Sequence, residues 1–288
     1  MSDNTQRERL LEAARQRRER QGRRGLRKQA PQSRRPEAII REYRAALRRI
    51  AKAMRSEAAG VLYPALTDLL DEAGTRGDAE RADDWPQRTA RLIESVSTAA
   101  AAQADTVKTM LPEIAQRLAQ FSDEEQRRLV RSVVGVEPTL SPDIDALLDS
   151  WIAENSSLIT TMSADAINEV EGIVQRGVRS GASPKKMKRE IARRFQISEN
   201  RAERIARTES GQLYTQIAKK RQTELGIRKF EWVTAEDERV RSSHEARNGK
   251  IYSWDDPPGG ELPGTPINCR CVARPLVSEL LDEMEASE

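Results

Sequence analysis

The chain has 288 residues, with 49 Lys and Arg against 46 Asp and Glu and a formal net charge of +3. No apolar run reaches the ~18 residues that span a bilayer, so we expect no membrane contact. Cys269 and Cys271 are separated by a single residue and cannot cross-link distant segments, which excludes a disulfide-stabilised domain. The first residues lack the apolar core of a secretory signal peptide, so we expect none.

The charge is distributed unevenly along the chain. Residues 1–60 carry 18 basic and 7 acidic side chains, residues 61–150 carry 9 and 17, and residues 151–288 carry 22 of each. Residues 1–36 are rich in arginine and poor in apolar side chains, which predicts a basic disordered arm. Part of this arm, residues 6–21, could become helical on binding. Its partner could be the phosphates of double-stranded DNA or an acidic protein surface.

Helical signals follow the arm. A helix is predicted from Glu37 to Ala59, because apolar side chains recur every three or four residues. Further on, Ser122 and Glu125 have the spacing of a capping box that begins a helix. Four well-capped helices are then predicted between residues 141 and 226, with Gly226 as the C-terminal glycine and with four serines as N-caps: Ser141, Ser163, Ser183 and Ser198.

After Gly226 the pattern changes to alternating apolar and polar residues. Residues 229–234, 251–254 and 271–276 are strand candidates, and the first two carry a cluster of aromatic side chains that predicts a small core. The predicted fold is mainly α with a small α+β C-terminal module: a helical N-terminal region, a four-helix segment and a short β-ribbon. We expect an arm at 1–36, a helical region at 37–140, a C-terminal domain at 141–277 and an acidic tail at 278–288.

Three motifs occur in order in the C-terminal half. They are Arg204 to Glu209 on a helix, a run from Trp232 through Asp237, Arg239 and Arg241 to His244, and Asn268-Cys269-Arg270-Cys271 after a proline-rich loop. From about Trp151 to Leu276 the chain resembles the phage Mu F-like family of minor head, or head morphogenesis, proteins. The matching positions are Arg207, Thr208, Glu209, Asp237, Arg239, Arg241, His244, Gly249, Pro266, Asn268, Cys269 and Cys271.

The resemblance implies a minor capsid component of a phage or prophage. It implies binding to the portal or major capsid protein during head assembly and genome delivery, and a place in the virion and the host cytoplasm. The family carries no agreed catalytic residues, so we expect no enzyme and no required cofactor. The sequence also contains no P-loop, which argues against a packaging ATPase.

His244, the only histidine, leaves three interpretations open. The favoured one is packing within a small core, with the cysteines as small apolar groups. A second is a zinc-stabilised interaction module, with His244, Cys269, Cys271 and Asp237 as candidate ligands. A third is a nucleic-acid-processing or toxin-like enzyme, in which His244 is a general base oriented by Asp237 and Arg239 or Arg241 holds a phosphate.

The first motif invites a structural interpretation as well. Arg207 and Glu209 are predicted to bridge their helix to the C-terminal ribbon, where Asp237 and Arg239 offer charged partners. A motif that spans two elements is better explained by a network that locks them together than by an active site.

Overall fold

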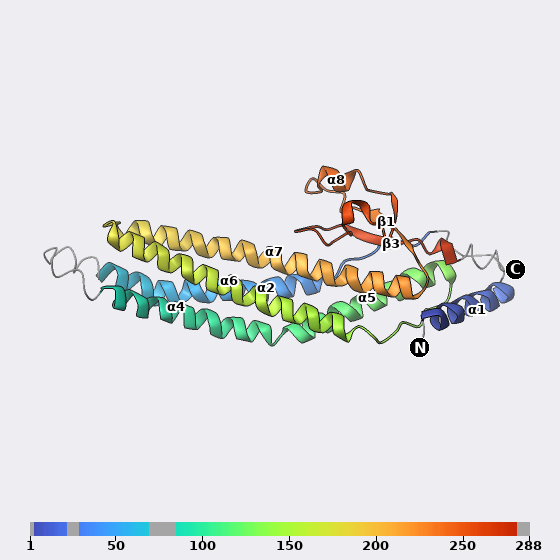
Figure 1. Cartoon of the computed structure of the whole chain (residues 1–288), viewed down its shortest axis with the longest axis horizontal. Helices are drawn as coiled ribbons and strands as arrows, with labels where there is room; N and C mark the ends of the chain where they lie inside the picture. The colour runs from blue at the N-terminus through green and yellow to red at the C-terminus, as the bar shows by residue number, and fades with distance from the viewer. Residues whose placement is uncertain (1–2, 22–28, 69–84, 281–288) are drawn as a thin grey trace. The chain divides into compact units, whose positions relative to one another are not determined.

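The computed structural model describes residues 3–21, 29–68 and 85–280 (Figure 1). The chain divides into two compact units. The sheet unit comprises residues 1–40, 113–151 and 207–288, and the bundle unit comprises residues 41–112 and 152–206. Among the described residues, none of the helices combines the length and the apolar character needed to cross a membrane.

The bundle unit is built from parts of four helices that run side by side (Figure 1). They are α2 (Glu37–Glu57), α4 (Trp85–Lys108), α6 (Asp145–Arg179) from residue 152 onward, and α7 (Pro184–Glu224) up to residue 206. α2 continues into the short π-helix η1 (Ala58–Leu62). Polar contacts between the described residues join the helices. Tyr43 donates a hydrogen bond to Asn155 at 2.7 Å, Arg201 pairs with Asp165 at 2.5 Å, and Arg44 pairs with Glu203 at 3.3 Å.

Two helices replace the four that were predicted between residues 141 and 226. Ser163 and Ser198 lie inside α6 and α7, and neither caps a helix. Their hydroxyls instead donate to carbonyls four residues earlier, Ser163 to Ile159 at 3.0 Å and Ser198 to Arg194 at 3.2 Å. A serine that bonds back to its own helix does not end it, so each apolar stripe continues through the predicted break.

The sheet unit contains α1 (Asp3–Gln21), α5 (Leu111–Val134) and a three-stranded antiparallel sheet. The strands are β1 (Lys229–Val233), β2 (Ile251–Ser253) and β3 (Val272–Pro275), and β1 lies between the other two. Two short helices, α8 (Ser242–Glu245) and η2 (Pro258–Gly260), lie in the connections. The prediction of a mainly α protein with a small β-containing C-terminal module is confirmed.

The aromatic core of the sheet forms as predicted. Phe230, Trp232 and Trp254 are completely buried, and Tyr252 packs against them. The Phe230 and Trp254 rings have centroids 4.4 Å apart. Cys269 and Cys271 belong to the same cluster, so the cysteine motif is part of the core of the sheet.

The prediction of a disordered arm is wrong for the described residues of segment 1–36. Asp3–Gln21 is a helix, and its Leu10 and Ala14 are buried against apolar residues of α5 and of the end of the chain, including Val130 and Leu280. These partners come from distant parts of the sequence and supply the buried surface that the arm lacks by itself. Residues 22–28 lie outside the described residues, as do the last eight residues of the predicted acidic tail.

The second half of the arm packs against the sheet and α5. Ser33 donates a hydrogen bond to the Ala273 carbonyl at 2.8 Å, and Gln29 donates to Glu231 at 2.8 Å. The backbone N–H and the guanidinium of Arg34 both bind Glu125, at 2.6 and 2.8 Å. These contacts anchor residues 29–36 next to β3.

The capping box predicted at Ser122 is also wrong, because α5 runs through it. The acidic residues of this segment serve tertiary ion pairs instead. Asp123 binds the buried Arg221 of α7 through two hydrogen bonds, at 2.7 and 3.1 Å. Glu125, whose carboxylate is completely buried, binds both Arg34 and Arg128. Burial raises the pKa of Glu125, but hydrogen bonds from Arg128 and Arg34 outweigh it, so the pKa lies below the usual value.

We predict that Glu125→Gln destabilises the sheet unit, because Arg34 and Arg128 lose the negative charge that they share. The free energy of unfolding should fall by about 2–3 kcal/mol near neutral pH, as for hydrogen bonds to charged groups. The folded carboxyl has the lower pKa, so its contribution is present above its unfolded pKa and disappears as the pH falls through its folded pKa. Urea unfolding at several pH values measures this, with the exposed Glu124→Gln as control.

Candidate functional site

One face of α7 carries a row of polar side chains that bind the loop leading to β3. Thr208, Gln212 and Thr215 are three or four residues apart and therefore share a face. The backbone N–H of Asn268 donates to the Thr208 hydroxyl at 3.1 Å. Gln212 and Thr215 donate to the carbonyls of Thr265 and Pro263, at 3.1 and 2.6 Å.

The row continues to the end of α7. Lys219 donates to the Trp254 carbonyl at 2.8 Å, and the Trp254 indole donates to Gln222 at 3.1 Å. Gln222 in turn donates to Gln126 of α5 at 2.9 Å. Most of these contacts use backbone groups, at residues 263–268 before β3 and at Trp254 after β2. They therefore fix the path of the chain next to both strands.

Gly211 permits the close approach between α7 and this loop. A Cβ atom at Gly211 would lie 2.7 Å from the Gly264 carbonyl oxygen, which is closer than real Cβ contacts. Gly264 has a φ of +85°, a conformation that favours glycine. Both glycines are therefore required where α7 meets the loop.

The Arg207-Thr208-Glu209 motif joins α7 to its surroundings through Thr208 and Glu209. Thr208, through its hydroxyl, makes the link to the loop. Glu209 contributes its backbone carbonyl, which accepts a hydrogen bond from the Trp151 indole at 3.0 Å. Of the charged groups on the ribbon, Asp237 forms a two-pronged ion pair with Arg270 and also accepts the backbone N–H of Arg239 at 3.1 Å.

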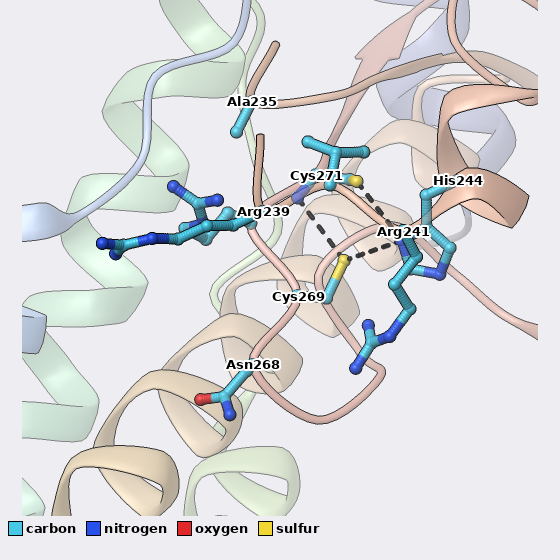
Figure 2. A pocket seen from close by; sticks show the side chains of 9 residues that line it. Ala235, Arg239, Arg241, His244, Asn268, Cys269 and Cys271 are labelled. Carbon is cyan, nitrogen blue, oxygen red and sulfur yellow. Dashed lines mark hydrogen bonds between the residues drawn. The ribbon is translucent and has the colours of Figure 1, made fainter. Parts of the chain in front are cut away.

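The loop delivers two cysteines to the single histidine. His244 lies on α8, and its Nδ1 is 3.5 Å from the Sγ of both Cys269 and Cys271 (Figure 2). All three side chains are buried, and their potential ligand atoms lie within 4.8 Å of one another. The backbone N–H of Cys271 also points to the sulfur of Cys269, at 3.4 Å.

A second layer of side chains holds the imidazole. His244 Nε2 is 3.7 Å from a Glu261 carboxylate oxygen, and Arg247 binds the same oxygen at 2.7 Å. Trp232 packs edge-on against the imidazole, with ring centroids 5.2 Å apart. The Arg247 guanidinium covers the face of that indole at 4.9 Å. Glu261 at Nε2 and Trp232 against the ring therefore fix the orientation of the His244 imidazole.

A pocket of about 110 Å³ opens beside the histidine and the two cysteines, and it is lined by arginines (Figure 2). Arg239, Arg241 and Arg270 contribute to its wall together with Asn268. Arg241 donates to the Ile267 carbonyl at 2.6 Å. Asp237, by contrast, is exposed and engaged by Arg270, so the structure brings it neither to the cysteines nor to the imidazole as the zinc and enzyme interpretations required.

The two thiols influence each other's ionisation. A hydrogen bond from Cys271 is the main reason that the pKa of Cys269 is lowered, to about 5, and backbone N–H groups and His244 add to this. The pKa of Cys271 is raised, first by its hydrogen bond to Cys269 and then by burial. The pair therefore loses its first proton easily and its second with difficulty.

The remaining motif positions shape the turns around the site. Gly249 has a φ of +73°, and its N–H donates to the Trp232 carbonyl at 2.8 Å, which returns the chain from α8 to β2. Pro266 accepts a hydrogen bond from the N–H of Cys269 at 2.9 Å. Asn268 has a φ of +59° between them. The turn at Pro266 and Asn268 sets the direction of the chain that carries Cys269 and Cys271 to the start of β3.

Residues 168–274 match the family described as phage Mu protein F like protein. The resemblance drawn from the motifs is confirmed. The Mu F-like segment begins within α6 and ends in β3, so it includes α7, the arginine-lined pocket and all twelve motif positions.

A relative in Haemophilus influenzae carries the description "Uncharacterized protein". It is 33% identical over 138 residues, which make up 48% of this chain and 31% of the relative. The chain therefore spans about a third of that protein's length. No solved structure matches the chain significantly.

Several residues that build the Mu F-like site were missed in the sequence. Glu261 and Arg247 give no local signal, because their role depends on where His244 lies. The row of polar residues on α7 did leave a signal. Thr208, Thr215 and Gln222 recur every seven residues, which places these uncharged polar side chains on one face of α7.

We predict that Gly211→Ala loosens the contact between α7 and the loop of the Mu F-like segment. Alanine favours helices over glycine by about 1 kcal/mol, but its Cβ would collide with the Gly264 carbonyl. A net loss of about 1–3 kcal/mol is expected, as for other overpacked sites. Thermal unfolding measures it, and Gly172→Ala is the control, because there the Cβ meets only the movable end of Arg176. Equal or higher stability of Gly211→Ala would contradict the required close approach.

Proposed function

We propose that this protein is a minor head protein of a phage or prophage, which acts by binding during head assembly and genome delivery. The observation that carries the proposal is the Mu F-like match, which includes β1, β2, most of β3 and the face of α7 that binds the loop before β3. The arrangement also supports a binding role, since most motif residues shape turns or join elements.

The protein is expected in the phage head. Deleting its gene from the phage or prophage that encodes it should leave heads with little packaged DNA or little infectivity, and the wild-type chain supplied in trans should restore both. Head counts by electron microscopy, DNA content and infectious titre measure the effect, and mass spectrometry of purified heads should find the chain. Heads with normal DNA content and infectivity in the deletion strain would overturn the proposal.

We further propose that the sheet unit supplies the contact with the portal or major capsid protein. β2 is an edge strand, and its Ile251 is 52% exposed, while Ile267 beside the pocket is 59% exposed. An unpaired strand edge with apolar side chains is a common docking surface for another chain.

Ile251→Ser and Ile267→Ser together should weaken capture of the portal protein encoded in the same genome without lowering the melting temperature. Ile197→Ser is the matched control, because Ile197 is 45% exposed but belongs to the bundle unit. A pull-down with purified portal and capsid proteins measures the effect. Unchanged binding by the double variant would place the contact outside this surface.

The basic N-terminal residues are proposed to bind packaged double-stranded DNA without reading its sequence. Deletion of residues 1–36 is a poor test, because it also removes Leu10, Ala14 and Ser33 from their buried positions. Replacing Arg23, Arg24, Arg27 and Lys28 by Gln removes positive charge from the arm and leaves Leu10, Ala14 and Ser33 in the chain. A phosphate-binding arm loses affinity in proportion to the contacts removed, and its salt dependence falls with them.

The four-Gln variant should bind DNA more weakly and with a salt slope smaller by up to ~3–4, measured by fluorescence anisotropy at several salt concentrations. The matched control replaces four exposed basic residues of α7 with Gln: Lys185, Lys186, Arg189 and Arg193. If both variants lose affinity equally, binding is diffuse and the arm has no special role. Retention of full affinity by the arm variant would favour an acidic protein surface as its partner.

A further inference from the structure

His244, Cys269 and Cys271 present three metal-binding atoms to one point in the interior of the sheet unit. Nδ1 of the imidazole lies 3.5 Å from each of the two sulfurs, and all three side chains are buried (Figure 2). They come from two separate segments, α8 and the turn before β3. Turns with positive φ, at Gly249 after α8 and at Asn268 before the cysteines, direct these two segments toward each other.

Hydrogen bonding alone does not explain this arrangement. An imidazole Nδ1 has either one lone pair or one N–H, so it forms one good hydrogen bond in the plane of the ring. Here two sulfurs lie at the same distance from it. One shared partner located between the three atoms would satisfy all of them.

The distances match those of a tetrahedral zinc site. Zinc binds cysteine sulfur at ~2.3 Å and histidine nitrogen at ~2.0–2.1 Å, which at a tetrahedral angle separates the nitrogen from each sulfur by about 3.5 Å. The same geometry separates the two sulfurs by about 3.8 Å. The observed nitrogen–sulfur distances are both 3.5 Å, as this geometry requires. The two sulfurs lie within 4.8 Å of each other, which is compatible with a sulfur–sulfur separation of about 3.8 Å.

The surroundings are also those of a metal site. A histidine that binds metal through one ring nitrogen usually gives its other N–H to a carboxylate, and Glu261 lies beside Nε2 at 3.7 Å. Arg247 holds that carboxylate in place. The backbone N–H of Cys271 offers a hydrogen bond to the Cys269 sulfur, and the buried indole N–H of Trp232 has no oxygen or nitrogen acceptor among the described residues. Both are donors available to thiolates.

A fourth protein ligand is absent from the described part of the chain. No other His, Cys, Asp or Glu joins the cluster there, and Asp237 is held away from it by Arg270. The arginine-lined pocket adjoins the cluster, so a fourth coordination position can open onto it. Zinc sites with three protein ligands keep such a position for water or another exchangeable ligand.

We propose that His244, Cys269 and Cys271 bind one Zn²⁺ ion, whose fourth position is exchangeable and faces the pocket of Arg239 and Arg241. Two thiolates and an imidazole select zinc over magnesium or calcium, which prefer oxygen ligands. The ion ties α8 to the start of β3, and the pocket gives small anions access to it. This proposal does not depend on the role of the protein in the phage head.

Elemental analysis of the purified full chain tests the ligand set. About one zinc ion per chain is expected in the wild type. His244→Asn, Cys269→Ser and Cys271→Ser should reduce this at least tenfold, whereas Asp237→Asn should retain it. Glu261→Gln should keep the site but weaken zinc affinity by about 10-fold or more in competition with a chelator. Zinc-free wild type that also fails to take up added zinc would overturn the proposal, and loss of zinc in Asp237→Asn would overturn the three-ligand set.

Cobalt replacement keeps the test decisive if the cysteine variants fold poorly. Co²⁺ in the wild-type chain should show the intense visible bands of tetrahedral coordination and the ultraviolet bands of cobalt–thiolate charge transfer. Azide should then shift the visible bands without releasing the metal, because it occupies the open position. Octahedral cobalt without thiolate bands would overturn the site. Visible bands unchanged by azide would show a closed, four-ligand site and overturn the exchangeable position.

Discussion

The contact between the second half of α7 and the loop before β3 is the constraint on which the rest of the sheet unit depends. The Thr208 hydroxyl holds the backbone of Asn268, Thr215 holds that of Pro263, and Gly211 allows the two backbones to approach. These interactions use backbone groups of the loop, so they fix its course directly. Because Cys269 and Cys271 follow directly, the same contact decides where their sulfurs lie relative to His244.

Several charged residues that belong to acidic or basic runs of the sequence form ion pairs with distant residues in the folded protein. The acidic residues at 123–125 and the basic residues of the N-terminal arm look like separate features in the sequence, yet Glu125 binds Arg34 inside the folded unit. Asp237 and Arg270 pair in the same way across the C-terminal motifs. Arg239 lines the pocket with an exposed side chain, so its positive charge is accessible to an anionic partner. The net charge of +3 therefore describes little of the surface that a partner meets.

Sequence reasoning worked where the signal is local. The three strands lie within a residue or two of their predicted positions, and Gly226 follows the end of α7 with the predicted positive φ, +83°. Sequence reasoning failed where one residue type is compatible with two local structures. Serine caps a helix or bonds back within it, and the choice at Ser163 and Ser198 depends on whether the apolar stripe stays buried beyond them. The prediction of a disordered arm failed for a related reason, because most of the apolar residues that cluster with Leu10 lie more than a hundred residues away in the chain.

The sequence by itself determined the fold class, the aromatic core around Trp232 and the resemblance to the Mu F-like family, because periodicity, turn residues and motif order are properties of neighbouring positions. It also named His244, Cys269 and Cys271 as one group. Only the tertiary structure decided their geometry. It excluded Asp237 from that group and supplied Glu261 behind the imidazole. Ligand sets are chosen by distances between residues far apart in sequence, and those distances are fixed by packing, which no local pattern encodes.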